Sequence, residues 1–222
     1  MKKILPLILI FGLFEMGCGN TQKQERKAVN INKKEIEEVK NDPEKQEKEV
    51  VVISTFYGDM VVELFESTAP KHVESFKTHA KNGFYDGTIF HRVIPGFMIQ
   101  GGDPNTKGDN KSIYGTGGHA AKYYGIGDES ESKSWNLPAE FSKISHKRGI
   151  LSMARSTSPN SGGSQFFICA ADAPHLDGQY TVFGQVIEGD SVIEQIVNLP
   201  RDSRDNPNKR VELKVKLEKR SE

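Results

Sequence analysis

The chain has 222 residues, and its 36% hydrophobic content with 21 glycines and 10 prolines is typical of a soluble globular protein. This composition excludes wholesale disorder and a polytopic membrane protein. Thirty Lys and Arg residues balance thirty Asp and Glu residues, so no net charge attracts nucleic acid. Two cysteines, Cys18 and Cys169, are too few for a disulfide framework or a four-cysteine zinc site.

The N-terminal segment has the regions of an export signal. Two lysines follow Met1, and the apolar run 4–14 is shorter than the roughly 20 residues of a membrane span. Gly17 before Cys18 resembles the processing site of bacterial lipoproteins, although Glu15 stands where that pattern has an aliphatic residue. We expect residues 1–17 to be a signal peptide and Cys18 to be acylated; a simple cleaved signal peptide and an uncleaved anchor are the alternatives.

Residues 18–49 comprise the predicted acylation site, Cys18, and the charged segment that follows it. The segment mixes basic and acidic side chains with few apolar ones, so it cannot bury enough surface to fold alone. As a flexible coil it would separate its ends by roughly 30 Å, which suits a tether. A short helix around residues 33–40 is the competing interpretation.

The patterns of one folded domain cover residues 50–219, followed by a short tail, 220–222. Apolar residues at helical spacing predict a helix with Pro70 in its first turn and another at 190–198. Gly58 and Asp59 predict a hairpin turn between the first two strands. The predicted strands are, in chain order, 50–57, 60–65, 88–93, 97–100, 149–153, 165–170, 181–187 and 211–217.

Eight strands with only two helices predict a mainly β fold. The strands do not alternate with helices, so a doubly wound parallel sheet is excluded. We expect a closed eight-stranded antiparallel barrel capped by two α-helices, because closure removes the edges of the sheet. The polar, glycine-rich segment 103–138 is too long for an ordinary connection, which indicates a functional loop.

Three patterns that could carry other chemistry are rejected. Residues 115–120 match a dinucleotide-binding glycine pattern but lack its flanking strand and helix. Cys169 lies in an apolar run, which is typical of an inert buried thiol. The six histidines lack the spacing of metal ligands, so we expect neither a metal nor another cofactor.

Residues 84–103, FYDGTIFHRVIPGFMIQGGD, closely resemble the signature of the cyclophilin family of peptidyl-prolyl isomerases. Two further blocks are similar to other segments of that family: GILSMA with GSQFFI at 149–154 and 163–168, and HLDG with VFG at 175–178 and 182–184. The blocks keep the family's order. The resemblance implies a cyclophilin-like fold, an eight-stranded barrel with two helices, and prolyl isomerase activity.

The residues within these blocks suit that chemistry. Rotation about an X-Pro bond faces a barrier of roughly 18–20 kcal/mol, and nothing covalent has to break. A catalyst therefore needs a dry pocket for the proline ring and a hydrogen-bond donor for the twisted state. Arg92 is a permanent fork of donors. By resemblance, Arg92, Gln100 and Phe97 are catalytic, and Gln100 positions Arg92 or the substrate carbonyl. The substrate-binding residues implied are Met98, Ala154, Arg155, Gln165, Phe167, His175, Leu176 and Tyr180.

Three positions depart from the family pattern. His175 stands where many eukaryotic members have tryptophan, and Tyr180 where they have a pocket histidine. Both keep a flat ring, so we expect isomerase activity but not cyclosporin binding. Arg155 replaces a common asparagine near the substrate backbone. His91, which precedes Arg92, should point to the opposite face of the strand.

Two functions remain in competition. The first is a monomeric isomerase that acts on proline-containing segments of exported proteins from the cell envelope, held at the membrane by a lipid on Cys18. A secreted or periplasmic soluble protein is the alternative location. The second function is a binding module or chaperone that uses the same groove without turnover. Arg92 and Gln100 favour the enzyme, because binding alone would need only the apolar lining.

Overall fold

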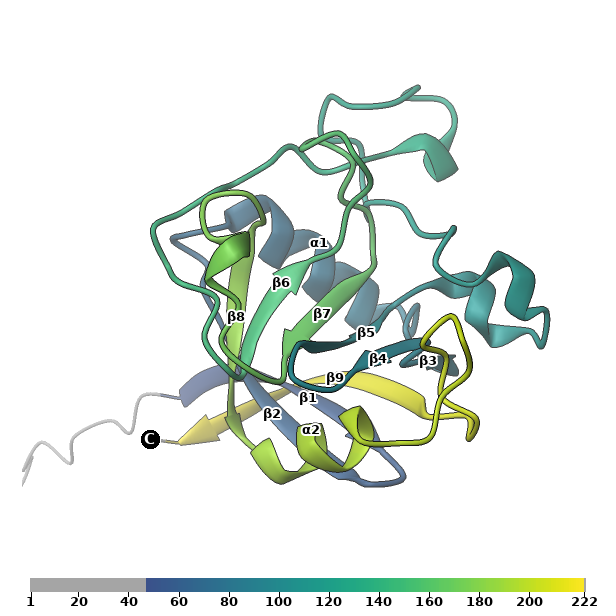
Figure 1. Cartoon of the computed structure of the whole chain (residues 1–222). Helices are drawn as coiled ribbons and strands as arrows, with labels where there is room; N and C mark the ends of the chain where they lie inside the picture. The colour runs from purple at the N-terminus through teal and green to yellow at the C-terminus, as the bar shows by residue number, and fades with distance from the viewer. Residues whose placement is uncertain (1–46, 222) are drawn as a thin grey trace, which may run out of the picture. The chain divides into compact units, whose positions relative to one another are not determined.

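The computed structural model describes residues 47–221, which form one curled β-sheet with two α-helices (Figure 1). The predicted signal peptide, Cys18 and most of the tether lie outside the described residues. No helix within 47–221 combines the length and the apolar character needed to cross a membrane. The elements are β1 (Glu47–Thr55), β2 (Gly58–Leu64), α1 (Pro70–Lys81), β3 (Thr88–Ile89), β4 (Arg92–Ile94), β5 (Met98–Gly101), β6 (Ile150–Met153), β7 (Phe166–Cys169), β8 (Val182–Glu188), α2 (Asp190–Val197) and β9 (Glu212–Ser221).

The sheet is antiparallel and open. Its nine strands have the order β3-β9-β1-β2-β8-β6-β7-β5-β4, so β3 and β4 are its two edges. The prediction of a closed eight-stranded barrel is therefore wrong. The predicted strand 88–93 breaks at Phe90, whose N–H donates to the Val211 carbonyl (3.0 Å) beside β9. The next N–H, that of His91, donates to the Gln100 carbonyl of β5 (3.0 Å). The chain thus passes from one edge of the sheet, where β3 pairs with β9, to the other edge, where β4 pairs with β5.

Both helices pack their apolar sides onto the inner face of the curled sheet. The main core contains Val73 and Phe76 of α1 together with Ile193 and Ile196 of α2. The helices were predicted at these places, and each covers a different part of the sheet (Figure 1). The Phe76 ring contacts the rings of Tyr85, Phe166 and Phe183, with centroids 5.0 to 5.5 Å apart.

Several boundaries differ from the sequence prediction. Thr55 pairs with Gly58, so the hairpin turn is Phe56 and Tyr57 rather than Gly58 and Asp59. Thr55 Oγ1 accepts from the Tyr57 N–H (3.0 Å) and donates to the Gly58 carbonyl (3.0 Å), which closes this turn. β1 and β9 pair from Glu47 and Ser221, so the paired strands extend beyond the predicted limits of 50 and 219.

The long segment 103–138 contains no β-strand among its described residues, as predicted. It carries short 3₁₀ helices at Pro104–Lys107, Lys111–Ile113 and Ser132–Ser134. The buried carboxylate of Asp103 accepts from the N–H groups of Asn105 (2.8 Å) and Gly115 (2.5 Å) and so fixes the start of the segment. Asp103 therefore holds Gly115, twelve residues further along the segment, next to the end of β5.

A distant carboxylate caps the start of α1. Glu140 accepts hydrogen bonds from the N–H groups of Lys71 (3.2 Å) and His72 (3.1 Å) and from His72 Nδ1 (2.7 Å). Burial alone would raise the pKa of Glu140, but these hydrogen bonds outweigh it and hold the pKa below its usual range. A carboxylate at a helix N-terminus is also favoured by the helix dipole.

Replacing Glu140 with glutamine is expected to lower the free energy of unfolding at pH 7 by about 1–2 kcal/mol. Because the folded pKa of Glu140 is depressed, its contribution is complete above the unfolded pKa of about 4.3 and disappears as pH falls through the folded pKa. Urea unfolding of both proteins between pH 3 and pH 7 measures this. A difference in stability that stays constant over that range would contradict the assignment.

Candidate active site

Three adjacent strands place Arg92, Gln100 and Phe167 in a row. Arg92 of β4 lies opposite Gln100 of β5, and Gln100 lies opposite Phe167 of β7. Residues directly opposite in an antiparallel pair have Cβ atoms about 4.5–5.5 Å apart on the same face. The register of the sheet therefore brings together a cationic, an amide and an aromatic side chain that are far apart in the sequence.

Strand alternation separates this face from the main core. Ile99 and Phe166 point into the main core, whereas Met98 and Phe167 belong to a second buried cluster on the other side of the sheet. His91 is buried and Arg92 is exposed, so these neighbours differ in environment, as their predicted opposite orientation would require. The second cluster is thus the floor of a site whose rim carries Arg92.

A cavity of about 220 Å³ opens on this face, and we call it the cup. Its lining contains every residue predicted for the site except Gln165 and His175. These residues are Arg92, Phe97, Met98, Gln100, Ala154, Arg155, Phe167, Leu176 and Tyr180. The floor of the cup is apolar and buried, because Met98, Phe167 and Leu176 are all less than 8% exposed. The structure thus joins side chains from four separate parts of the sequence in one small cavity.

His175 lies within the short 3₁₀ helix Pro174–Leu176, and Tyr180 comes four residues after that helix ends. The His175 ring lies against Phe97 at the rim, with centroids 5.5 Å apart, and it does not line the cup. The Tyr180 ring meets Phe167 edge to face at 5.9 Å and forms one wall. His175 is therefore placed to contact a longer peptide rather than the ring inside the cup.

Arg92 lies next to a carboxylate that the sequence analysis did not identify. Its side chain is 44% exposed, and its Nε is 3.8 Å from Asp205 Oδ2. Asp205 has a φ of 64°, and it is the one residue other than glycine with positive φ within 47–221. Its carbonyl accepts from the Val93 N–H (2.9 Å), which fixes the 201–206 loop beside β4. The backbone thus holds a counter-charge close to the guanidinium.

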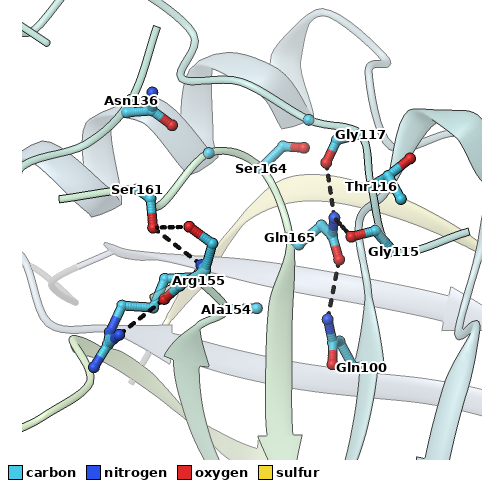
Figure 2. A pocket seen from close by; sticks show the side chains of 13 residues that line it. Gln100, Gly115, Thr116, Gly117, Asn136, Ala154, Arg155, Ser161, Ser164 and Gln165 are labelled. Carbon is cyan, nitrogen blue, oxygen red and sulfur yellow. Dashed lines mark hydrogen bonds between the residues drawn. The ribbon is translucent and has the colours of Figure 1, made fainter. Parts of the chain in front are cut away.

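Gln100 is fixed by a chain of amide hydrogen bonds that leads away from Arg92. Its Nε2 donates to Gln165 Oε1 (3.0 Å), and Gln165 Nε2 donates to the carbonyls of Gly115 (3.0 Å) and Gly117 (2.7 Å), as Figure 2 shows. These glycines belong to the pattern 115–120, whose backbone carbonyls here accept hydrogen bonds from the side-chain amide of Gln165. Gln165 also lines a second, polar cavity of about 390 Å³ that shares Gln100 and Arg155 with the cup.

The guanidinium of Arg155 is engaged by backbone carbonyls. It donates to Gln179 (2.9 and 3.2 Å), Ser156 (2.9 Å) and Thr157 (3.1 Å), and it lies 4.4 Å from the centre of the Tyr180 ring. Arg155 therefore joins two loops at the rim. Arg155 also lines the cup, so its predicted place near the substrate backbone stays a prediction.

Replacing Arg155 with alanine is expected to lower kcat/KM for an Ala-Pro peptide about threefold to tenfold, mainly through KM, because the rim loses its connection. Steady-state assays over a range of peptide concentrations separate the two constants. Arg155→Lys keeps the charge but lacks the planar fork, so it should behave like alanine. Full activity in the lysine variant would show that only the charge matters.

A buried polar network behind Phe167 was missed by the sequence analysis. His146 Nδ1 lies 2.9 Å from Asp177 Oδ1, and His146 Nε2 lies 3.1 Å from Ser152 Oγ, which donates to Thr181 (3.0 Å). The His146 ring stacks on Phe167 at 6.2 Å. Hydrogen bonds from the backbone N–H and ring of His146 lower the pKa of Asp177. Because Ser152 is fully buried, we assign this network to support of the cup rather than to nucleophilic chemistry.

Cys169 is buried under the cup, and its fully enclosed thiol fits the inert role that was predicted. Burial raises the pKa of this thiol to about 12, so the thiolate is not formed near neutral pH. The chemistry available is therefore noncovalent. An apolar ring bound in the cup would present its amide bond to the donors of Arg92.

Comparison with known proteins agrees with this geometry. Residues 50–217 match the family model described as cyclophilin type peptidyl-prolyl cis-trans isomerase. A probable peptidyl-prolyl cis-trans isomerase of Brucella suis is 44% identical over 150 residues, covering 66% of this chain and 70% of the relative. The isomerase ppi1 of Schizosaccharomyces pombe is 43% identical over 159 residues, covering 71% and 90%. A crystal structure of a Cryptosporidium parvum cyclophilin type isomerase in the presence of the dipeptide Ala-Pro has a TM-score of 0.65 at 36% identity, covering 78% of this chain and 99% of that one.

Proposed function

Because the chain belongs to the cyclophilin-type peptidyl-prolyl cis-trans isomerases, we propose that it accelerates X-Pro rotation in exported proteins and so assists their folding. Isomerase activity comes with the family. The exported substrates are inferred from the signal-like residues 1–17 and from Cys18. Uncatalysed rotation takes tens to hundreds of seconds, which is slow enough to limit folding after export.

In the proposed mechanism the proline ring of the substrate occupies the cup. In the planar amide the nitrogen lone pair is delocalised into the carbonyl, and twisting localises that pair on the nitrogen. Arg92 then donates a hydrogen bond to this nitrogen, an interaction that is stronger in the twisted state than in the ground state and therefore lowers the barrier. Gln100 lies opposite Arg92 in the sheet, and its hydrogen bond with Gln165 fixes its side chain there. The observation that carries the proposal is Arg92 on the rim of a cavity whose floor consists of buried apolar side chains.

Refolding of a secreted protein with a slow prolyl phase tests the folding role. Catalytic amounts of the full chain should shorten that phase in proportion to their concentration, whereas the Arg92→Ala variant should leave it unchanged. A slow phase with the same rate in the presence and absence of the protein would contradict the proposal. Double-jump refolding, which varies the time spent unfolded, identifies the phase as prolyl.

The membrane attachment is a separate part of the proposal, and it rests on the resemblance of residues 1–18 to a lipoprotein signal. Mass spectrometry of the mature N-terminus should find a diacylated Cys18, because two acyl chains anchor a protein stably. Cys18→Ala should release the protein from the membrane fraction. A mature N-terminus without acyl groups would instead indicate a secreted or periplasmic soluble protein, and an intact Met1 an uncleaved anchor.

A binding or chaperone function is the second candidate, and the polar cavity that adjoins the cup favours it because an extended chain could contact both. The two functions separate in the Arg92→Ala variant. A chaperone would still suppress aggregation of a proline-containing client after isomerisation is lost. An enzyme that acts only by turnover would lose both effects together.

A further inference from the structure

A third cavity adjoins the cup on the other side of Arg92 and Gln100. Its volume is about 230 Å³, and we call it the arginine cavity. Its lining is polar and consists of His91, Arg92, Gln100, Tyr114, Gly115, Arg204 and Asn206. Because Arg92 and Gln100 line the cup as well, the two cavities meet at these side chains. A peptide with its proline in the cup therefore has a neighbouring residue within reach of the arginine cavity.

Two guanidinium groups line this cavity. Arg92 comes from β4, and Arg204 comes from the loop that follows α2 and lies beside β3 and β4 (Figure 1). Arg204 Nη2 donates to the Lys111 carbonyl (2.8 Å). This hydrogen bond uses one of the five N–H donors of the guanidinium. Burial lowers the pKa of His91 to about 4, so the His91 ring is neutral at pH 7 and the positive charge comes from the arginines.

The carboxylates around the cavity offset only part of this charge. Asp205 lies between Arg92 (3.8 Å) and Arg201 (3.2 Å), so one carboxylate faces two guanidinium groups. Asp202 accepts from the N–H groups of Arg204 (2.9 Å) and Asn206 (3.0 Å), and it lies 3.8 Å from the Lys111 ammonium.

The buried Asp103 accepts from the backbone of the 103–115 segment. The four cationic groups in and around the arginine cavity, on Arg92, Arg201, Arg204 and Lys111, outnumber the three carboxylates by one. Arg92 and Arg204 are exposed and line the cavity, so both can meet a ligand.

We propose that the arginine cavity binds a carboxylate side chain of the substrate, so that the protein prefers proline segments with Asp or Glu within two residues of the proline. The inference rests on the proposed function, because it places the proline in the cup. The two cavities share Arg92 and Gln100, and two residues of extended chain span about 7 Å, so we expect one extended peptide to reach both. The planar guanidinium groups suit a carboxylate, with which they form paired hydrogen bonds.

Matched peptides test the preference. Each proline peptide carries a single Glu or Gln at one of the two positions before or the two positions after the proline, with alanine at the others. The values of kcat/KM and Kd are measured with the full chain at low ionic strength. We expect Glu to be favoured roughly fivefold at one of these positions, and the preference to shrink as salt is raised. A Glu-to-Gln ratio near one at all positions would overturn the inference, and it would leave the isomerase function intact if both peptides turn over.

Variants locate the effect. Arg204→Gln should reduce the Glu-to-Gln ratio to less than twofold, and Arg204→Lys should retain part of it. Lys209→Gln is the matched control, because it removes the same charge from the same connection but Lys209 does not line the arginine cavity. An unchanged ratio in Arg204→Gln, or an equal loss in Lys209→Gln, would overturn the assignment. Tighter binding of the Glu peptide that depends on Arg204, without turnover of either peptide, would support this inference and contradict the proposed function.

Discussion

Replacing Arg92 with alanine is expected to lower kcat/KM for an Ala-Pro peptide several hundredfold. The reason is that Arg92 is the charged donor on the rim of the cup, in register with Gln100 and Phe167. A donor already in position that strengthens only in the transition state contributes roughly 3–4 kcal/mol, and about 1.4 kcal/mol corresponds to a factor of ten in rate. A protease-coupled assay of the full chain and the variant measures the ratio directly.

The variant should remain folded, which separates a catalytic effect from a structural one. The Arg92 side chain is exposed, and its contact with Asp205 is a loose surface ion pair, so its removal should change the free energy of unfolding by less than about 1 kcal/mol. Peptide Kd should change much less than kcat. Arg92→Lys keeps the charge but not the fork and should recover only part of the rate. Equal kcat/KM in the alanine variant and the parent protein would refute the role of Arg92.

The sequence predicted the strands that carry the candidate site, but it did not predict that the sheet is open. The strands that carry Arg92, Gln100 and Phe167 were expected from short β-branched and aromatic runs, and the family motif assigned the side chains. Closure was predicted wrongly, because a run such as 88–93 looks continuous in sequence. Its break at Phe90 depends on which neighbouring strands accept the hydrogen bonds of successive N–H groups, and this information is nonlocal.

The supporting contacts were missed for a related reason. Asp205, Ser152 and His146 lie in unremarkable local sequence, and they acquire their roles only through partners far along the chain. Aspartate is common in loops, so its presence at position 205 does not indicate a positive φ. The glycine-rich segment 103–138 was the one usable signal, since its predicted functional character fits the contact of Gly115 and Gly117 with Gln165.

Phe167 both lines the cup and belongs to the buried cluster beneath it. Among the residues that line the cup, Phe167→Ala is expected to be the most destabilising change. Phe167 is 5% exposed, stacks on His146 and contacts Tyr180. Removing a buried phenylalanine leaves a cavity and costs about 3–5 kcal/mol of unfolding free energy. For a domain of this size that lowers Tm by roughly 10 °C or more. Urea unfolding and thermal melting measure the loss, and kcat/KM should fall as well because the floor of the cup is gone.

Phe97→Ala is the matched control, because Phe97 lines the same cup from a half-buried position at the rim. It should also lower kcat/KM, but its cost in unfolding free energy should be only about 1 kcal/mol, since the ring buries less surface and leaves no enclosed cavity. The urea m-value should be unchanged in both variants if the folded state keeps its compactness. If Phe167→Ala were to cost no more than about 1 kcal/mol, as we expect for Phe97→Ala, the second buried cluster would not depend on Phe167 and other side chains would hold the floor of the cup.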